Sequence, residues 1–175
     1  MIYSFNNGKD GAFPWAPPVQ TQDGRLWGVT YNGNTPGTWY ELDNSTIVAT
    51  GRLPSATTAP LHASQDGNLY GTTPNGSDSS VNYNQGTVYK LTQAGQLTVL
   101  HSFNPNTAYE GLNPTGPVIE GSDGFLYGTT CWGGQTTSGL PATTNGLGTV
   151  FMVTRDGSTF KTIHAFQDNA TVHEG

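Results

Sequence analysis

Short runs of apolar or alternating residues, separated by Gly-containing turns, recur along the whole chain. Near the C-terminus the runs are 117–120, 125–130, 148–154 and 160–166. Their length and alternation are typical of β-strands. Asp-Gly pairs such as Asp123-Gly124 stand between neighbouring runs and favour tight hairpin turns, because they tolerate positive φ. The pattern therefore predicts a unit of four antiparallel strands.

Three phrases recur in a fixed order. A turn followed by a strand occurs at 21–30, 64–73 and 121–130. The start of the next strand repeats at 37–42, 86–91 and 148–153. The closing phrase of a unit occurs at 100–103 and 163–166, and residues 2–5 open the chain with the same pattern. Such repetition indicates a single array of similar units rather than several unrelated domains.

The phrases divide the chain, residues 1–175, into three units with partial units at both ends. Unit one is predicted at 17–50, unit two at 59–103 and unit three at 117–166. Residues 2–5 are predicted to be the last strand of a preceding unit, and 167–175 the start of the next connection. The units differ in length because two connections vary. These variable connections join the second strand to the third, and the fourth to the next unit.

Repeats of roughly 40 to 50 residues with four strands are typical of propeller blades. We therefore expect an all-β fold, a β-propeller-like array of about three four-stranded antiparallel blades. Closed propellers typically carry about four to eight blades. Three blades leave the ring to be completed by oligomerisation or by sequence outside this chain. A homodimer with six blades is the simplest closed arrangement, since two-fold dimers are the commonest assembly.

The recurring phrases resemble the GloVer repeats, a bacterial tandem-repeat family. The resemblance is close at 121–130, Gly133-Gly134, 148–151 and 101–103, and looser in unit one. It implies a secreted or surface-attached, β-propeller-like array, and so an extracellular or cell-surface location. It implies no particular reaction or ligand.

Charge and cysteine content narrow the possible partners. The net charge is −6 with only six Lys and Arg residues, so no basic patch is available for nucleic-acid phosphates or an anionic membrane. No apolar run reaches the roughly 20 residues of a spanning helix, so membrane insertion is not expected. Cys131 is the only cysteine, which rules out an intrachain disulfide. The sequons at Asn44, Asn75 and Asn169 matter only if the source glycosylates.

The histidines and turn aspartates do not predict a metal or cofactor site. His101 and His164 hold the same repeat position, and equivalent positions of adjacent blades do not converge on one point as metal ligands must. The Asp-Gly turns lack the clustered oxygen ligands of a calcium loop. His62 aligns with Glu120 in the next unit, and we expect a structural role for it.

An acidic residue followed by Gly recurs in the connection between units, at Asp10-Gly11, Glu110-Gly111 and Glu174-Gly175. Because the pattern belongs to the repeat, a structural role that caps the next strand is the favoured interpretation. Paired carboxylates about 5 to 9 Å apart would suit glycoside hydrolysis. Asp10, Glu110 and His62 are therefore kept as acid–base candidates for a polysaccharide lyase or hydrolase, although no catalytic motif is present.

The least repetitive residues are aromatics in the variable connections. They are Trp15, Tyr31, Tyr83, Tyr109 and Trp132. Flat aromatic faces beside Asn, Asp and Gln suit sugar rings, although packing of the loops against the blade is an equal alternative. The favoured function is a non-catalytic extracellular binding or surface-display module with carbohydrate as its ligand. The alternatives are a polysaccharide-active enzyme and a purely structural self-assembling protein.

Overall fold

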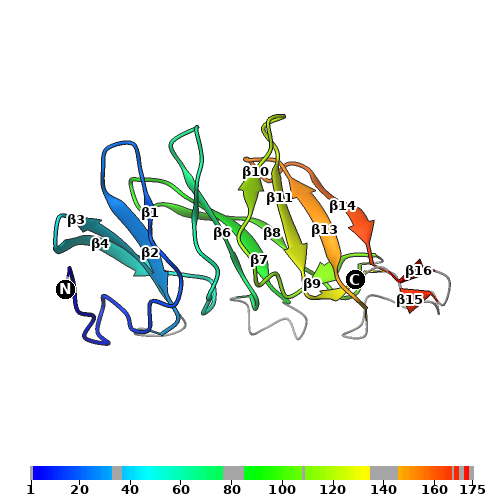
Figure 1. Ribbon diagram of the computed structural model, residues 1–175, viewed down its shortest axis with the longest axis horizontal. Coiled ribbons are helices and arrows are strands. Elements are labelled where there is room, and N and C mark those ends of the chain that lie inside the picture. Colours follow the sequence, from blue (N-terminus) through cyan, green and yellow to red (C-terminus); the bar gives the residue numbers. More distant parts are fainter. Residues whose placement is uncertain are drawn as a thin grey trace.

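Three four-stranded antiparallel sheets stand side by side along the molecule (Figure 1). The computed structural model describes residues 2–32, 37–76, 85–107, 109–134 and 146–166, and the backbone alone at 168–169 and 172–173. The described residues form strands and turns and no helix, so the fold is all-β as predicted. None of them forms a helix able to span a membrane.

Each sheet is a simple meander in which strands adjacent in sequence pair with one another. The first sheet contains β1 (Val19–Gln20), β2 (Leu26–Thr30), β3 (Thr38–Asp43) and β4 (Thr46–Arg52). The second contains β5 (His62–Ala63), β6 (Leu69–Thr73), β7 (Thr87–Leu91) and β8 (Leu97–Ser102). The third contains β10 (Ile119–Glu120), β11 (Leu126–Thr130), β13 (Thr149–Val153) and β14 (Phe160–Ala165).

Two short ladders complete the described structure. They are β9 (Gly111–Leu112) with β12 (Trp132–Gly133), and β15 (Asp168–Asn169) with β16 (Val172–His173).

The first strand of each sheet is shorter than predicted, because only two residues of β1, β5 and β10 enter the ladder. The first sheet extends two residues beyond its predicted end, since β4 continues to Arg52.

The predicted Asp-Gly turns join the first two strands of every sheet in the same way. Gly24, Gly67 and Gly124 have φ between 82° and 87°, the region that glycine adopts without steric cost. The preceding aspartate accepts a backbone N–H two residues ahead, as Asp66 does from Asn68 at 2.9 Å. This side-chain bond fixes the turn and hence the register of the hairpin.

Two hydrophobic cores hold the three sheets face to face. The first core includes Trp27, Val29, Trp39, Leu53, Leu61, Leu69, Tyr89 and Leu91. The second includes Tyr70, Val88, Leu100, Phe103, Leu112, Val118, Leu126, Phe151 and Val153. Within β6, Leu69 belongs to one core and its neighbour Tyr70 to the other, because successive side chains point to opposite faces. This explains why the strands of the middle sheet have hydrophobic residues at consecutive positions.

Residues 2–5, for which we predicted the last strand of a preceding unit, form no strand in the structure. The described chain offers them no neighbouring strand to pair with. Phe5 nevertheless packs edge-on against Tyr40 of β3, with ring centroids 5.0 Å apart. Phe103 packs in the same way on Phe151 of the third sheet, at 5.3 Å. The opening residues therefore make the contact of a closing phrase without its backbone pairing.

The described sheets form an open row, not a closed ring (Figure 1). The N-terminus lies at one end of the row beside the first sheet, and the C-terminal strands lie at the other. One face of the third sheet is less covered than its counterparts. Thr129 is exposed there, whereas the equivalent Val29 and Thr72 are buried between sheets.

Candidate binding site

Three exposed aromatic side chains gather at the end of the first sheet. Trp15 and Tyr31 stack with centroids 4.8 Å apart and planes 24° from parallel. Phe13 lies 6.4 Å from Trp15 at a tilt of 47°. Trp15 is 64% exposed and Phe13 is 54% exposed. We call this group the aromatic platform, an exposed cluster of apolar rings.

Backbone hydrogen bonds fix the platform to the sheet. Ala12 and Asn32 form an antiparallel bridge just beyond the end of β2. The carbonyl oxygen of Phe13 accepts the N–H of Trp15 at 2.9 Å and the N–H of Tyr31 at 3.0 Å. A single carbonyl therefore sets the relative position of the two stacked rings. The platform is held by rigid backbone, although its side chains face water.

Unit three has the same backbone arrangement with different side chains. Leu112 pairs with Trp132, as Ala12 pairs with Asn32. The carbonyl of Asn113 accepts the N–H of Cys131 at 3.2 Å, as that of Phe13 accepts from Tyr31. The platform positions are thus occupied by Asn113, Thr115 and Cys131. Since this scaffold forms with polar and small residues, the fold does not require three aromatics in unit one.

Phe13 also has an unfavourable backbone conformation. Its φ is 59°, in the left-handed region that Asn and Gly adopt far more readily than Phe. The equivalent Asn113 has φ 56°, so the conformation belongs to the scaffold. A large aromatic at this position costs stability, and such costs are concentrated at functional sites.

The remaining predicted aromatics are separate. Tyr109 is 52% exposed and Trp132 is 49% exposed, both in connections of the third unit. No ring contact joins either of them to another aromatic in the described part of the chain. Tyr83 lies outside the described residues. The structure thus brings together two of the five predicted residues, Trp15 and Tyr31, and adds Phe13.

The first acid–Gly pair is built into the N-terminal segment. Asp10 is buried, and its carboxylate accepts hydrogen bonds from the Tyr3 hydroxyl at 2.9 Å and from backbone N–H groups of Asn6 and Gly8. Burial alone would raise the pKa of Asp10, but these hydrogen bonds lower it below its ordinary value. Asp10 is therefore a satisfied carboxylate that ties residues 3–8 together.

Glu110 occupies the equivalent position in the next connection. It is buried, and its carboxylate pairs with Nε2 of His101, which belongs to β8. The His101 ring lies flat on Phe160, with centroids 3.5 Å apart and planes 3° from parallel. His101, Glu110, Phe160 and Thr162 line a pocket of about 480 Å³. The third pair, Glu174-Gly175, lies outside the described residues.

Steric contact explains the glycine of the two acid–Gly pairs that the structure describes, Gly11 and Gly111. Oγ1 atoms of Thr30 and Thr38 lie 2.6 Å apart, and those of Thr130 and Thr149 lie 2.9 Å apart. A Cβ atom on Gly11 would overlap the first pair, and one on Gly111 would overlap the second. The connection therefore crosses the end of the sheet in contact with these threonines, where only glycine fits.

His62 lies in a different cluster, between the second and third sheets. Its Nε2 is 3.7 Å from Oε2 of Glu120 and has no hydrogen-bond partner among the described residues. Burial lowers the pKa of His62, and the charge of Asp66 acts weakly in the opposite direction. Glu120 pairs instead with Arg155 and accepts the Ser64 hydroxyl at 2.7 Å. No hydrogen bond or ion pair of the described residues links Asp10, Glu110 and His62 to one another.

The described part of the chain contains no cluster of side chains that could bind a metal ion. No three His, Cys, Asp or Glu side chains there are grouped closely enough to hold an ion. The exposed Cys131 contacts the Thr115 hydroxyl at 2.9 Å.

Sequence reasoning missed two residues for which a signal existed. Phe13 is a non-repetitive aromatic directly before Pro14, in the connection that also contains Trp15. Tyr3 aligns with His101 in the closing phrase, which indicates that it partners the acid that follows. The stacking of Trp15 on Tyr31 could not be predicted, because it depends on the backbone bridge between two distant loops.

Comparison with known proteins agrees with the repeat pattern. The family model of the Gloeobacter/Verrucomicrobia repeat matches residues 1–174. This is the family that the recurring phrases resemble, and the match spans all three sheets. No curated protein matches the chain.

Proposed function

The chain belongs to the Gloeobacter/Verrucomicrobia repeat family, and we propose that it is a non-catalytic binding module for carbohydrate. The observation that carries the proposal is the aromatic platform of Phe13, Trp15 and Tyr31. Equivalent positions in unit three have no aromatic residue, so packing of the repeat does not account for it. Loops on a rigid scaffold are common binding sites.

A neutral glycan is the ligand class that this surface suits. The apolar face of a sugar ring can lie on the exposed Trp15 ring. With six Lys and Arg residues in 175 and a net charge of −6, the chain has little to offer a polyanion. An extracellular or surface location would give the module access to such glycans.

Affinity electrophoresis through gels containing neutral polysaccharides tests the proposal. The wild-type chain should be retarded by at least one polysaccharide, and Trp15→Thr, which installs the unit-three residue, should migrate as in a blank gel. Because Trp15 is 64% exposed, the variant should unfold within about 0.5 kcal/mol of wild type. Equal retardation of both proteins, or none across the panel, would count against the platform.

We propose that the three sheets are part of a propeller-like ring. In each sheet the short first strand, β1, β5 or β10, lies at one edge, and β1 lies beside β5. Ser64, which follows β5, donates its hydroxyl to Glu120 at the end of β10 at 2.7 Å. First strands that follow one another along one side of the array suit the inner rim of a propeller. Further blades, from a second copy or from additional repeats, would close it.

A polysaccharide-active enzyme is the second candidate, favoured by the pocket around Glu110 and His101. A buried carboxylate paired with an imidazole is a common acid–base arrangement. The comparable pairing of Asp10 with Tyr3 favours instead a structural cross-link that recurs in the repeat. Release of reducing or unsaturated sugar ends by the wild-type chain, abolished in Glu110→Gln, would establish the enzyme. Absence of such sugar ends would favour the non-catalytic binding module over the enzyme.

A further inference from the structure

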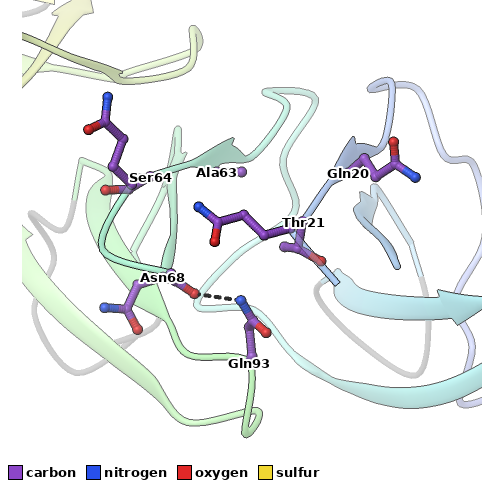
Figure 2. Close-up of a pocket in the computed structure, with 9 residues that line it drawn as sticks. Gln20, Thr21, Ala63, Ser64, Asn68 and Gln93 are labelled. Carbon is purple, nitrogen blue, oxygen red and sulfur yellow. Dashed lines mark hydrogen bonds between the residues drawn. The ribbon is translucent and has the colours of Figure 1, made fainter. Parts of the chain in front are cut away.

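A second pocket, of about 140 Å³, opens between the first and second sheets (Figure 2). It lies at the Asp-Gly turns, which are at the opposite end of the strands from the aromatic platform. Its wall is rich in side-chain amides, contributed by Gln20, Gln22, Gln65, Asn68 and Gln93. No charged side chain is among the residues that line it.

The pocket has a counterpart between the second and third sheets. The sequence alignment of His62 with Glu120 was wrong. The register of the strands makes Ala63 the equivalent of Glu120, because Ala63 pairs with Leu69 as Glu120 pairs with Leu126. Gln93 and Arg155 are equivalent as well, because each reaches over the turn glycine of its own sheet. A Cβ on Gly67 would lie 3.9 Å from Gln93 Nε2, and one on Gly124 would lie 3.8 Å from Arg155.

In the counterpart, a charged side chain bridges the two sheets. The Glu120 carboxylate pairs with Arg155 and accepts the Ser64 hydroxyl of the preceding sheet at 2.7 Å. In the first interface Ala63 stands in place of Glu120, and Gln93 stands in place of Arg155. Two replacements therefore distinguish the first interface, since a methyl group stands in place of the bridging carboxylate and an uncharged amide in place of the arginine.

We propose that this amide-lined pocket binds a small neutral polyhydroxylated ligand, such as a single sugar ring or a polyol. Side-chain amides both donate and accept hydrogen bonds, as hydroxyl groups do. The amide of Gln93 is held by its bond to the Gly67 carbonyl at 2.9 Å, and that of Gln20 by its bond to the Gly24 carbonyl at 3.0 Å. These bonds orient the amides before a ligand arrives, which lowers the cost of binding.

Charge and size restrict the ligand class. Replacement of Arg155 by Gln93 removes the cation that a carboxylate or phosphate would need. Sites for drug-sized ligands occupy about 300 to 1,000 Å³, so a pocket of about 140 Å³ admits one small ring or a chain end. The proposal does not depend on the aromatic platform, because different residues at the other end of the strands carry it.

Nitrogen-15 NMR titration of the full chain tests the pocket directly, with glucose, galactose and glycerol as separate probes. At least one probe should shift the side-chain amide signals of Gln20, Asn68 and Gln93 in a saturable manner. In Ala63→Glu/Gln93→Arg, which copies the arrangement of the next interface, the affinity should fall by about tenfold or more because the bridging pair fills the space. Gln93→Ala, which adds no bulk, should also weaken binding.

Trp15→Thr serves as the matched control and should leave the amide shifts unchanged, which separates this pocket from the platform. Thermal unfolding confirms that the variants are folded, and Gln93→Ala provides the test if the double variant is not. Two results would overturn the proposal. One is no saturable shift of these amides with any probe, and the other is equal affinity of wild type and the folded pocket variants.

Discussion

Phe13 combines an exposed aromatic ring with a backbone conformation that disfavours it. Its φ of 59° matches that of Asn113 at the equivalent position, where the side-chain amide also bonds to the Pro74 carbonyl at 2.8 Å. Selection for stability alone would place Asn or Gly there. Retention of Phe is therefore most simply explained by a role of the ring in binding.

Phe13→Asn separates the two effects. Relief of the left-handed strain should raise the free energy of unfolding by about 0.5 to 1 kcal/mol, while loss of the ring should weaken glycan binding. Chemical denaturation and the gel retardation assay measure the two quantities on the same protein. A variant that is less stable than wild type, or that binds equally well, would argue against this account of Phe13.

At Gly111, in contrast to Phe13, packing and not backbone conformation determines which residue can be accommodated. Its φ is not in the left-handed region, but a Cβ would overlap the hydroxyl oxygens of Thr130 and Thr149. Gly111→Ala should therefore destabilise the chain by about 1 to 3 kcal/mol, as expected for overpacking. Gly116→Ala is the control, since the nearest atom to its Cβ would be 3.9 Å away. Equal unfolding midpoints for the two variants would contradict the steric argument.

At the scale of elements, the Asp-Gly hairpins give the array a pH dependence. Partial burial tends to raise the pKa of Asp66, but hydrogen bonds from Asn68 and Tyr70 lower it to about 2 from an ordinary 3.8. A carboxyl with a lowered pKa stabilises the fold above pH of about 4, and this stabilisation is lost as pH falls towards 2.

Asp66→Asn should accordingly cost stability at neutral pH and cost progressively less below pH of about 4. Because the turn is solvent-accessible, screening limits the effect to about 1 kcal/mol. Urea unfolding of both proteins between pH 7 and pH 2 measures it. A stability difference that stays constant over this range would exclude the titration of Asp66 as its cause.

The strands were predictable because they repeat local signals, whereas the site was only partly so. The Asp-Gly pairs, the alternating runs and the closing phrases predict three four-stranded sheets, and each is found. The sequence also marks Trp15 and Tyr31 as departures from the repeat. It does not reveal that a bridge between Ala12 and Asn32 stacks them, because that contact joins residues distant in sequence. Residues 2–5 have the closing pattern yet form no strand, since strand formation requires a partner.

At the scale of the whole molecule, the outward face of the third sheet is the natural place for another unit. Tyr127 is only partly covered there, whereas the equivalent Trp27 and Tyr70 are fully buried against the next sheet. Ile119 is 62% exposed on the edge strand β10. The same face of the first two sheets forms the two cores, so it is suited to a third such interface.

We expect the 18.5 kDa chain to self-associate through this face. Light scattering on a sizing column should give a mass that is a multiple of the chain, with a dimer the simplest ring-forming assembly. Ile119→Lys should shift the population towards monomer without loss of folded structure, and Phe13→Asn should not. A wild-type monomer at all concentrations would contradict assembly by this chain alone.

The most direct test of the account is a tryptophan fluorescence titration with the neutral oligosaccharide that corresponds to the best retarding polysaccharide. Trp27 and Trp39 are buried, so a ligand that covers the platform should alter the emission of exposed Trp15. The account predicts a saturable change in wild type that persists in Trp132→Thr and disappears in Trp15→Thr. The same saturable change in Trp15→Thr as in wild type would contradict it.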